Sequence, residues 1–359
     1  MKILVGLSGG IDSCVTAYLL KEQGYEVEGA TMLIWKEDSP YPAPVSSNSC
    51  YAPEKKEDLE RIRAFCDKIG IKYHTLDCTD IYESTVLENF RSEYMAGRTP
   101  NPCVWCNARI KFGAPVDYAK ASGLVFDKFA TGHYARIRHN EESGGRWELL
   151  KGVDLKKDQS YFLYRLSQEQ LSRTLFPLGD KEKKDIRAID ETLGFHEKGQ
   201  SESQDFYGGD YTDLLMVKDK KGRIVTTDGV PVGEHNGFWH YTIGQRKGLG
   251  IAAKEPLYVV ALDSVKNEVI VGYDDDTHQT RVDVKEVNYV SETEFEEGKL
   301  YSVKIRSASP GVQAYVNKSE KGFSVKFPSF VKAATSGQSC VVYDGDRVIA
   351  GGIIESASK

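Results

Sequence analysis

Short apolar runs alternate with amphipathic stretches over the first 200 residues. Runs such as "KILVGL" and "EVEGATML" are typical of buried strands, and apolar residues at helical spacing follow each of them. The pattern predicts further strands at "KYHTLDC" and "DKFATGHYA", with helices over 54–69, 82–95 and 107–122. This order predicts an α/β fold, a doubly wound parallel sheet with helices on both faces.

The pattern changes after about residue 200. A Gly-rich mixed stretch comes first, and from residue 256 the chain is almost wholly strand-like. Asp344 and Gly345 separate two apolar runs, which is a strong hairpin signal. We therefore expect a catalytic domain at 1–200, a small central domain at 201–275 and a C-terminal antiparallel β-barrel at 276–359.

Composition narrows the class of protein. The chain has 359 residues, of which 40% are hydrophobic and 28% charged, as in soluble globular proteins. No apolar run approaches the roughly 20 residues of a membrane span, and the start lacks the apolar region of a signal peptide. We expect a cytoplasmic monomer with no membrane partner, and the seven scattered cysteines do not suggest a disulfide scaffold.

The charge balance argues against non-specific binding of nucleic acid. The net charge is −6, although basic residues cluster at 135–139, 155–159 and 244–248. Because charges act over only about 8–10 Å in salt, such clusters could still bind phosphates locally. Taken one at a time, each cluster is better interpreted as a solvated surface.

"GLSGGIDS" at 6–13 follows a strand and opens a helix. Its glycines allow a tight turn, and the helix N-terminus presents unpaired N–H groups to an anion. Ser8 and Ser13 add hydroxyl donors, and the Asp12 carboxylate could hold a magnesium ion bound to phosphate oxygens. The octapeptide resembles the PP-loop of the ATP pyrophosphatase superfamily. That resemblance implies ATP and Mg²⁺.

Five later stretches narrow the resemblance. In order they are "RTPNPCVWCNARIKFG" at 98–113, "ATGHYAR", "KDQSYFL", "GFWHYTIGQRKGLG" and "GQSCVVYDGDRVIAGG". Together with the PP-loop they resemble the tRNA-specific 2-thiouridylase family over essentially the whole chain. Members of that family replace O2 of the wobble uridine of certain tRNAs by sulfur, through an adenylated uridine. The resemblance therefore implies tRNA as substrate, and a sulfur-donating protein or a sulfide source as a further partner.

Roles carry over where residues match the family's motifs. The resemblance implies that the ATP site consists of Gly6, Leu7, Ser8, Gly9, Gly10, Ile11, Asp12, Ser13, Met32 and Gly132. It implies that Cys106 is the sulfur-bearing nucleophile, with Asn101 and Pro102 against the target base beside Cys103. It implies tRNA contacts at His133, Lys157, Asp158, Gln159, Arg306 and Gln338.

The sequence departs from the family at two positions. The family usually has Asp where Cys103 stands, and a second catalytic cysteine shortly after an "ESQD" stretch. Here "SESQDFYGGDY", 201–211, contains no cysteine. Either Cys103 has taken over as the second catalytic thiol, or sulfur arrives by another route. A helix after Cys106 would place its thiol near the positive end and lower its pKa.

Metal binding is the alternative use of the pair. Two cysteines are too few to close a zinc site. A [4Fe–4S] cluster held by Cys50, Cys103 and Cys106 stays open, and we favour the dithiol. Two other functions also stay open: a PP-loop ligase acting on a small carboxylate, and a non-catalytic RNA-binding or iron–sulfur carrier protein.

Overall fold

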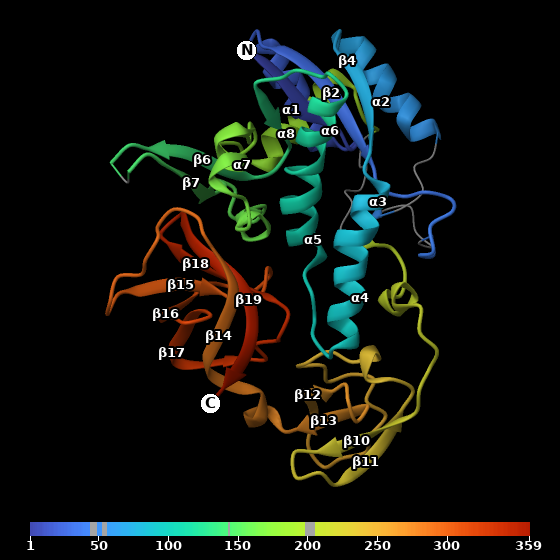
Figure 1. The fold of residues 1–359 in the computed structure, drawn as a ribbon, viewed down its shortest axis with the longest axis vertical. Coiled ribbons are helices and arrows are strands. Elements are labelled where there is room, and N and C mark those ends of the chain that lie inside the picture. The colour runs from blue at the N-terminus through green and yellow to red at the C-terminus, as the bar shows by residue number, and fades with distance from the viewer. Residues whose placement is uncertain (44–48, 52–55, 143, 198–204) are drawn as a thin grey trace.

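A computed structural model describes residues 1–43, 49–51, 56–142, 144–197 and 205–359. Figure 1 shows a parallel sheet with its helices, a barrel, and a smaller sheet, with the helical segments α4 and α5 between them. In the described part of the chain, no helix combines the length and the apolar content needed to cross a lipid bilayer.

The N-terminal region is built on a five-stranded parallel sheet of order β4-β2-β1-β5-β8. Its strands are β1 (Lys2–Gly6), β2 (Glu26–Leu33), β4 (Lys72–Asp77), β5 (Lys128–Ala130) and β8 (Thr174–Leu175). Three longer helices accompany it: α1 (Ile11–Glu22), α2 (Lys56–Ile69) and α8 (Lys183–Leu193).

Side chains of β1 alternate between two cores. Ile3 and Val5 pack with residues of α1 and α2, whereas Leu4 packs on the other face with Ile110 and Phe112. Both faces of the sheet are thus covered, because successive side chains of a strand point to opposite sides. The predicted doubly wound sheet is confirmed.

The segment that carries the cysteine pair is more helical than its sequence indicates. It contains α3 (Thr79–Tyr82), a π-helix (Glu83–Leu87), α4 (Glu88–Met95), α5 (Pro102–Trp105), a second π-helix (Cys106–Lys111) and α6 (Ala114–Ala121). The prediction that a helix begins after Cys106 was wrong: α5 begins at Pro102, and Pro suits the first helical position. Cys106 therefore lies inside a helical stretch, one turn beyond Cys103.

Two small sheets follow. The central sheet has the order β11-β10-β13-β12, and β3 pairs in parallel with β9. The strands are β3 (Ser49–Tyr51), β9 (Asp205–Tyr207), β10 (Gly222–Thr226), β11 (Pro231–His235), β12 (Tyr258–Asp263) and β13 (Glu268–Gly272).

The C-terminal region is a closed antiparallel barrel, as predicted. Its strands are β14 (His278–Tyr289), β15 (Leu300–Lys304), β16 (Val312–Ser319), β17 (Gly322–Lys332), β18 (Ser339–Asp344) and β19 (Arg347–Ser358). The pairing of β14 with β19 closes it. The hairpin at Gly345 is confirmed too: Asp344 is opposite Arg347, and Gly345 has φ +60°.

A hairpin from the N-terminal region joins the sheet of the barrel. It consists of β6 (Ala135–Asn140) and β7 (Arg146–Lys151), and Arg347 of β19 is opposite Leu150 of β7. Gln168, on the short helix α7 (Gln168–Arg173), donates to both Trp147 O and Val290 O, at 2.9 and 2.8 Å. These contacts tie regions far apart in the sequence, which the hydrophobic pattern did not predict.

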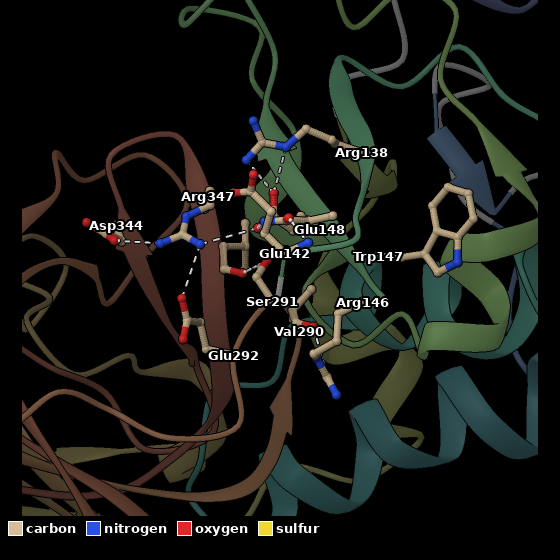
Figure 2. A network of polar contacts seen from close by, with 12 residues as sticks. Arg138, Glu142, Arg146, Trp147, Glu148, Val290, Ser291, Glu292, Asp344 and Arg347 are labelled. Atoms are coloured by element: carbon tan, nitrogen blue, oxygen red, sulfur yellow. Dashed lines mark hydrogen bonds and ion pairs between the residues drawn. The ribbon is translucent and has the colours of Figure 1, made fainter. Parts of the chain in front are cut away.

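The polar centre of this junction is Glu148, whose carboxylate is fully buried (Figure 2). It accepts hydrogen bonds from Arg138 Nε at 2.8 Å, Asn140 Nδ2 at 2.8 Å and Arg347 Nη1 at 3.3 Å. Burial alone raises the pKa of Glu148, but these hydrogen bonds outweigh it and hold the pKa below its ordinary value. Arg136 pairs with Asp346, so the basic cluster at 135–139 is largely neutralised within the protein.

We predict that Glu148→Gln destabilises the junction by about 1–3 kcal/mol, because two arginines lose their buried countercharge. Since the folded pKa is depressed, this contribution is present at neutral pH and is lost as pH falls through the folded value. Thermal unfolding should show a lower midpoint for the variant at about pH 7, and a smaller difference near pH 4. Glu141→Gln, on the exposed end of β6's hairpin, is the control. Equal midpoints for Glu148→Gln and the native chain would contradict the account.

Candidate active site

The loop at 6–13 forms a compact turn between β1 and α1. Gly9 has φ +74°, a conformation that favours glycine. Ser13 Oγ accepts from Ser8 N at 3.2 Å and donates to Gly10 O at 2.9 Å. Gly10 stands at the N-terminus of the twelve-residue helix α1, without a side-chain cap. The first amides of α1 are thus left for an anion, as a phosphate-binding loop requires.

Asp12 is already held by other side chains. Its Oδ1 accepts from Lys183 Nζ at 2.7 Å and from the Tyr134 hydroxyl at 2.8 Å. Lys183 is buried and comes from the start of α8, far along the chain. No local sequence pattern indicates this pairing. A magnesium ion at Asp12 would therefore use Oδ2 or displace Lys183.

Gly132 touches Asp12 directly. A Cβ at Gly132 would stand 2.8 Å from the carbonyl carbon of Asp12 and 2.9 Å from its Cβ, too close for any side chain. The segment after β5 is therefore pressed against the first turn of α1. The two stretches that the sequence assigned to ATP meet at the carboxyl edge of the sheet.

His133 is buried beside this contact. Its Nδ1 shares a hydrogen bond of 2.8 Å with Thr131 Oγ1, and its ring packs against Phe112 and Phe176. Burial, with the charge of Lys111 as a second cause, lowers its pKa well below the ordinary value. His133 is thus a neutral imidazole in the interior.

The two thiols of the pair stand one helical turn apart and are half-buried. Burial raises the pKa of Cys106 to about 11, although the charge of Lys111 works against this rise. The prediction that Cys106 has a lowered pKa is wrong for this state, because burial outweighs the position in the helix. None of the seven cysteines, all within the described ranges, forms a disulfide.

Lys111 is a functional candidate that the sequence analysis missed. Burial alone would lower the pKa of Lys111, but Cys106, Cys50 and Cys103 together outweigh burial. The pKa therefore lies above its ordinary value, and the ammonium stays charged. Within the described ranges Lys111 makes no recorded hydrogen bond or ion pair, so its charge faces the thiols without a carboxylate to neutralise it. Cys106 and Lys111 are the first and last residues of one π-helix. Their spacing in the sequence indicates an interaction only when that helix is known.

The residues expected to lie against the target base are held by the barrel. Gln338 Nε2 donates to Thr99 O at 3.2 Å and Pro100 O at 3.3 Å. Asn101 follows at the N-cap of α5 and makes no side-chain cap. The barrel thus positions the chain just before Pro102.

The other expected tRNA contacts are mostly engaged within the protein. Asp158 accepts from Gly152 N and Ser160 N at 3.1 Å each. Gln159 Oε1 accepts from Tyr134 N at 2.9 Å.

Arg306 likewise has partners inside the protein. Its Nη2 donates to Ala333 O at 2.5 Å and Thr335 Oγ1 at 3.0 Å. Lys157 is half-buried, and Met32 lies at the end of β2, packed against the main core.

Profiles of three families match consecutive parts of the chain. They are described as tRNA methyl transferase HUP domain, at residues 1–207, tRNA methyl transferase PRC-barrel domain, at 215–273, and Aminomethyltransferase beta-barrel domain, at 279–354. The matches follow the order of the three regions of the fold.

Relatives match over the whole chain. A protein of Endomicrobium trichonymphae named tRNA-specific 2-thiouridylase MnmA is 45% identical over 357 residues, which cover 99% of this chain and 99% of that protein. Proteins of the same name from Clostridioides difficile and Picosynechococcus sp. are 40% and 42% identical, and each match covers 99% of this chain and 98% of the relative.

We predict that Lys111→Met makes Cys106 less reactive, because its thiolate loses a cation that stabilises it. The rate of iodoacetamide alkylation at Cys106, followed by mass spectrometry at about pH 8, should fall by about threefold or more. Lys111→Arg should keep most of the rate. Arg109→Met is the matched control, since Arg109 lies on the same π-helix but lines a separate cavity of about 430 Å³. An unchanged rate in Lys111→Met would show that this ammonium does not act on the thiol.

Proposed function

The chain belongs to the tRNA-specific 2-thiouridylase family, and on this premise we propose that it replaces O2 of the wobble uridine of tRNA by sulfur. The observation that carries the proposal is a chain of neighbours at one edge of the sheet. Gly132 packs on Asp12 of the phosphate loop. Burial and then the charge of Lys111 lower the pKa of the adjacent His133, and the same charge partly offsets the rise that burial causes in the pKa of Cys106. An activated oxygen and a sulfur nucleophile can therefore meet there.

ATP supplies the activation. The free amides at the start of α1 suit the phosphates of ATP, and cleavage between the α and β phosphates would join AMP to uridine O2. Mg²⁺ would neutralise the departing pyrophosphate, with Asp12 Oδ2 as its carboxylate ligand, because the hydrogen bonds from Lys183 and Tyr134 both go to Oδ1. We place this reaction in the cytoplasm.

Sulfur transfer then uses the paired thiols. Cys106 carries an outer sulfur as a persulfide, and that sulfur attacks C2 of the adenylated uridine while AMP leaves with the former O2. The Cys103 thiolate next attacks the Cys106 sulfur, the S–S bond to the uridine breaks, and 2-thiouridine is released. Two electrons pass from the two thiols to the transferred sulfur, so an external dithiol must reduce the resulting Cys103–Cys106 disulfide.

An iron–sulfur cluster is the alternative for the same thiols. Thiolates suit iron, and Cys50, Cys103 and Cys106 all act on Lys111 electrostatically. The dithiol needs only Cys103 and Cys106, which stand one helical turn apart. A bound cluster would keep both thiols as ligands, whereas release of 2-thiouridine by disulfide formation needs both of them free. We keep the dithiol mechanism, and iron analysis of protein purified without oxygen distinguishes the two.

Recognition of tRNA is proposed to involve the barrel and the stretch at 157–159. Gln338 fixes the chain before Asn101, which would place the target base near Cys106. Asp158 and Gln159 support this surface through their contacts with the backbone. Lys157 would supply the charge that binds phosphate.

We predict that the protein, given tRNA and Mg²⁺, converts ATP to AMP and pyrophosphate. Asp12→Asn should abolish this turnover, because Lys183 and Tyr134 lose the carboxylate that orders the first turn of α1. Cys106→Ser should still form AMP and pyrophosphate but, with cysteine persulfide as the sulfur donor, should give no thiolated tRNA. Both products can be followed by chromatography of labelled ATP and mass analysis of the tRNA. Release of ADP and phosphate instead would contradict the proposed activation.

We predict that Lys157→Ala weakens tRNA binding and lowers the slope of log affinity against log salt by about one, as expected for one lost phosphate contact. Binding measured at several salt concentrations tests this. Lys156→Ala, which removes the neighbouring exposed lysine, is the control. Equal losses from both variants would indicate a diffuse basic surface rather than a specific contact.

A further inference from the structure

The strand that carries Cys50 lies beside the stretch in which the family's second cysteine is missing. Ser49 of β3 is opposite Asp205 of β9, and Tyr51 is opposite Tyr207. Residues 201–204, just before β9, lie outside the described residues. β3 therefore brings a thiol from early in the chain beside Asp205–Tyr207, within the stretch 201–211 that contains no cysteine.

The alternation along β3 turns Cys50 outward. Ser49 and Tyr51 are buried, with 7% and 0% of their surface exposed, whereas Cys50 is exposed. Of the seven cysteines, all described, four are buried and Cys103 and Cys106 are half-buried. A macromolecular or small persulfide can thus reach Cys50 before it can reach the thiols inside.

Cys50 also belongs to the surroundings of the inner thiols. The ring of Tyr51 stacks on that of Tyr82, with centroids 5.5 Å apart and planes 7° apart. Burial is the main cause that raises the pKa of Tyr82, and Cys106, Cys50 and Cys103 add to the rise. Burial likewise raises the pKa of Cys106, and Cys50 adds a smaller contribution.

We propose that Cys50 is the receiving thiol of the sulfur relay, which takes sulfur from an external persulfide and passes it inward to Cys106. This inference builds on the proposed function. The Cys50 thiolate attacks the outer sulfur of a donor persulfide, the donor thiolate leaves, and Cys50 becomes a persulfide. The Cys106 thiolate then attacks that outer sulfur, and the Cys50 thiolate leaves. Each exchange moves one sulfane sulfur from a persulfide to a thiolate, so the donor returns to a thiol and no separate oxidant is needed. Cys103 stays available for the final release.

The relay explains how a shielded nucleophile receives its sulfur. Cys106 is half-buried whereas Cys50 is exposed, so a bulky donor persulfide has better access to Cys50. A persulfide on Cys50 extends the reach of that side chain by about 2 Å, the length of one S–S bond. The exposed thiol collects sulfur, and the inner thiol delivers it to the base.

The test labels the thiols directly. The full chain is incubated with cysteine persulfide, blocked with iodoacetamide and analysed by peptide mass spectrometry. In Cys106→Ser, persulfide should accumulate on Cys50. In Cys50→Ser, persulfide on Cys106 should form at least tenfold more slowly than in the native chain. The buried Cys14, Cys66 and Cys340 are internal controls and should stay unlabelled.

A variant that moves the thiol by one residue along β3 tests whether the outward position of the thiol matters, because it keeps the number of cysteines unchanged. Ser49→Cys combined with Cys50→Ser moves the thiol by one residue, which turns it to the buried face of β3. This variant should not restore labelling of Cys106. Full restoration, or labelling of Cys106 at the native rate in Cys50→Ser, would overturn the relay. Stoichiometric iron and labile sulfide in anaerobically purified protein, lost in Cys50→Ser, would overturn it as well.

Sodium sulfide distinguishes this inference from the proposed function. With ATP, tRNA and sulfide, Cys50→Ser should thiolate tRNA within twofold of the native rate, because sulfide attacks C2 of the adenylated uridine directly, AMP leaves with the former O2, and no persulfide has to form. If the native chain fails to thiolate tRNA both with sulfide and with cysteine persulfide as the donor, the proposed function is wrong. The labelling result still decides the role of Cys50 in that case.

Discussion

The close approach of Gly132 to Asp12 is the contact on which the site depends. No side chain fits between the end of β5 and the first turn of α1, so the two stretches are in van der Waals contact through their backbones. This contact brings the Tyr134 hydroxyl to Asp12. The phosphate loop and the segment after β5 therefore meet at the carboxyl edge of the sheet, where ligands of parallel α/β sheets commonly bind. The helical stretch that carries the thiols is linked to this edge through Lys111, whose charge adds to burial in lowering the pKa of His133.

The charged groups divide into those that hold the fold and those that serve the site. Arg138 and Arg347 neutralise Glu148, and Arg306 donates to backbone oxygens, so these cations are used in joining the barrel to the rest. Lys111, by contrast, is paired with no carboxylate among the described residues and acts on thiols. In a chain with net charge −6, such a cation is a local feature that composition cannot reveal.

Patterns within short stretches of the sequence predicted the structural features that depend on neighbouring residues alone. The phosphate loop, the parallel sheet and the hairpin at Gly345 follow from apolar periodicity and turn chemistry. The apolar pattern predicts the start of the helix too late, because Pro102 at the first helical position adds nothing to the apolar periodicity. The joining of β7 to β19, the Asp12–Lys183 pair and the approach of β3 to β9 could not be predicted, because each joins residues more than a hundred positions apart. The raised pKa of Cys106 was missed for the same reason: burial by distant segments decides it.

Activation of uridine O2 by ATP, close to the paired thiols, is the central step of the proposed reaction. The most direct measurement follows that oxygen atom. A tRNA whose wobble uridine carries a heavy oxygen isotope at O2 is thiolated by the native protein with ATP, Mg²⁺ and sulfide, and the products are analysed by mass spectrometry. The account predicts that the label leaves the tRNA and appears in the phosphate of AMP. Thiolated tRNA together with unlabelled AMP would contradict it.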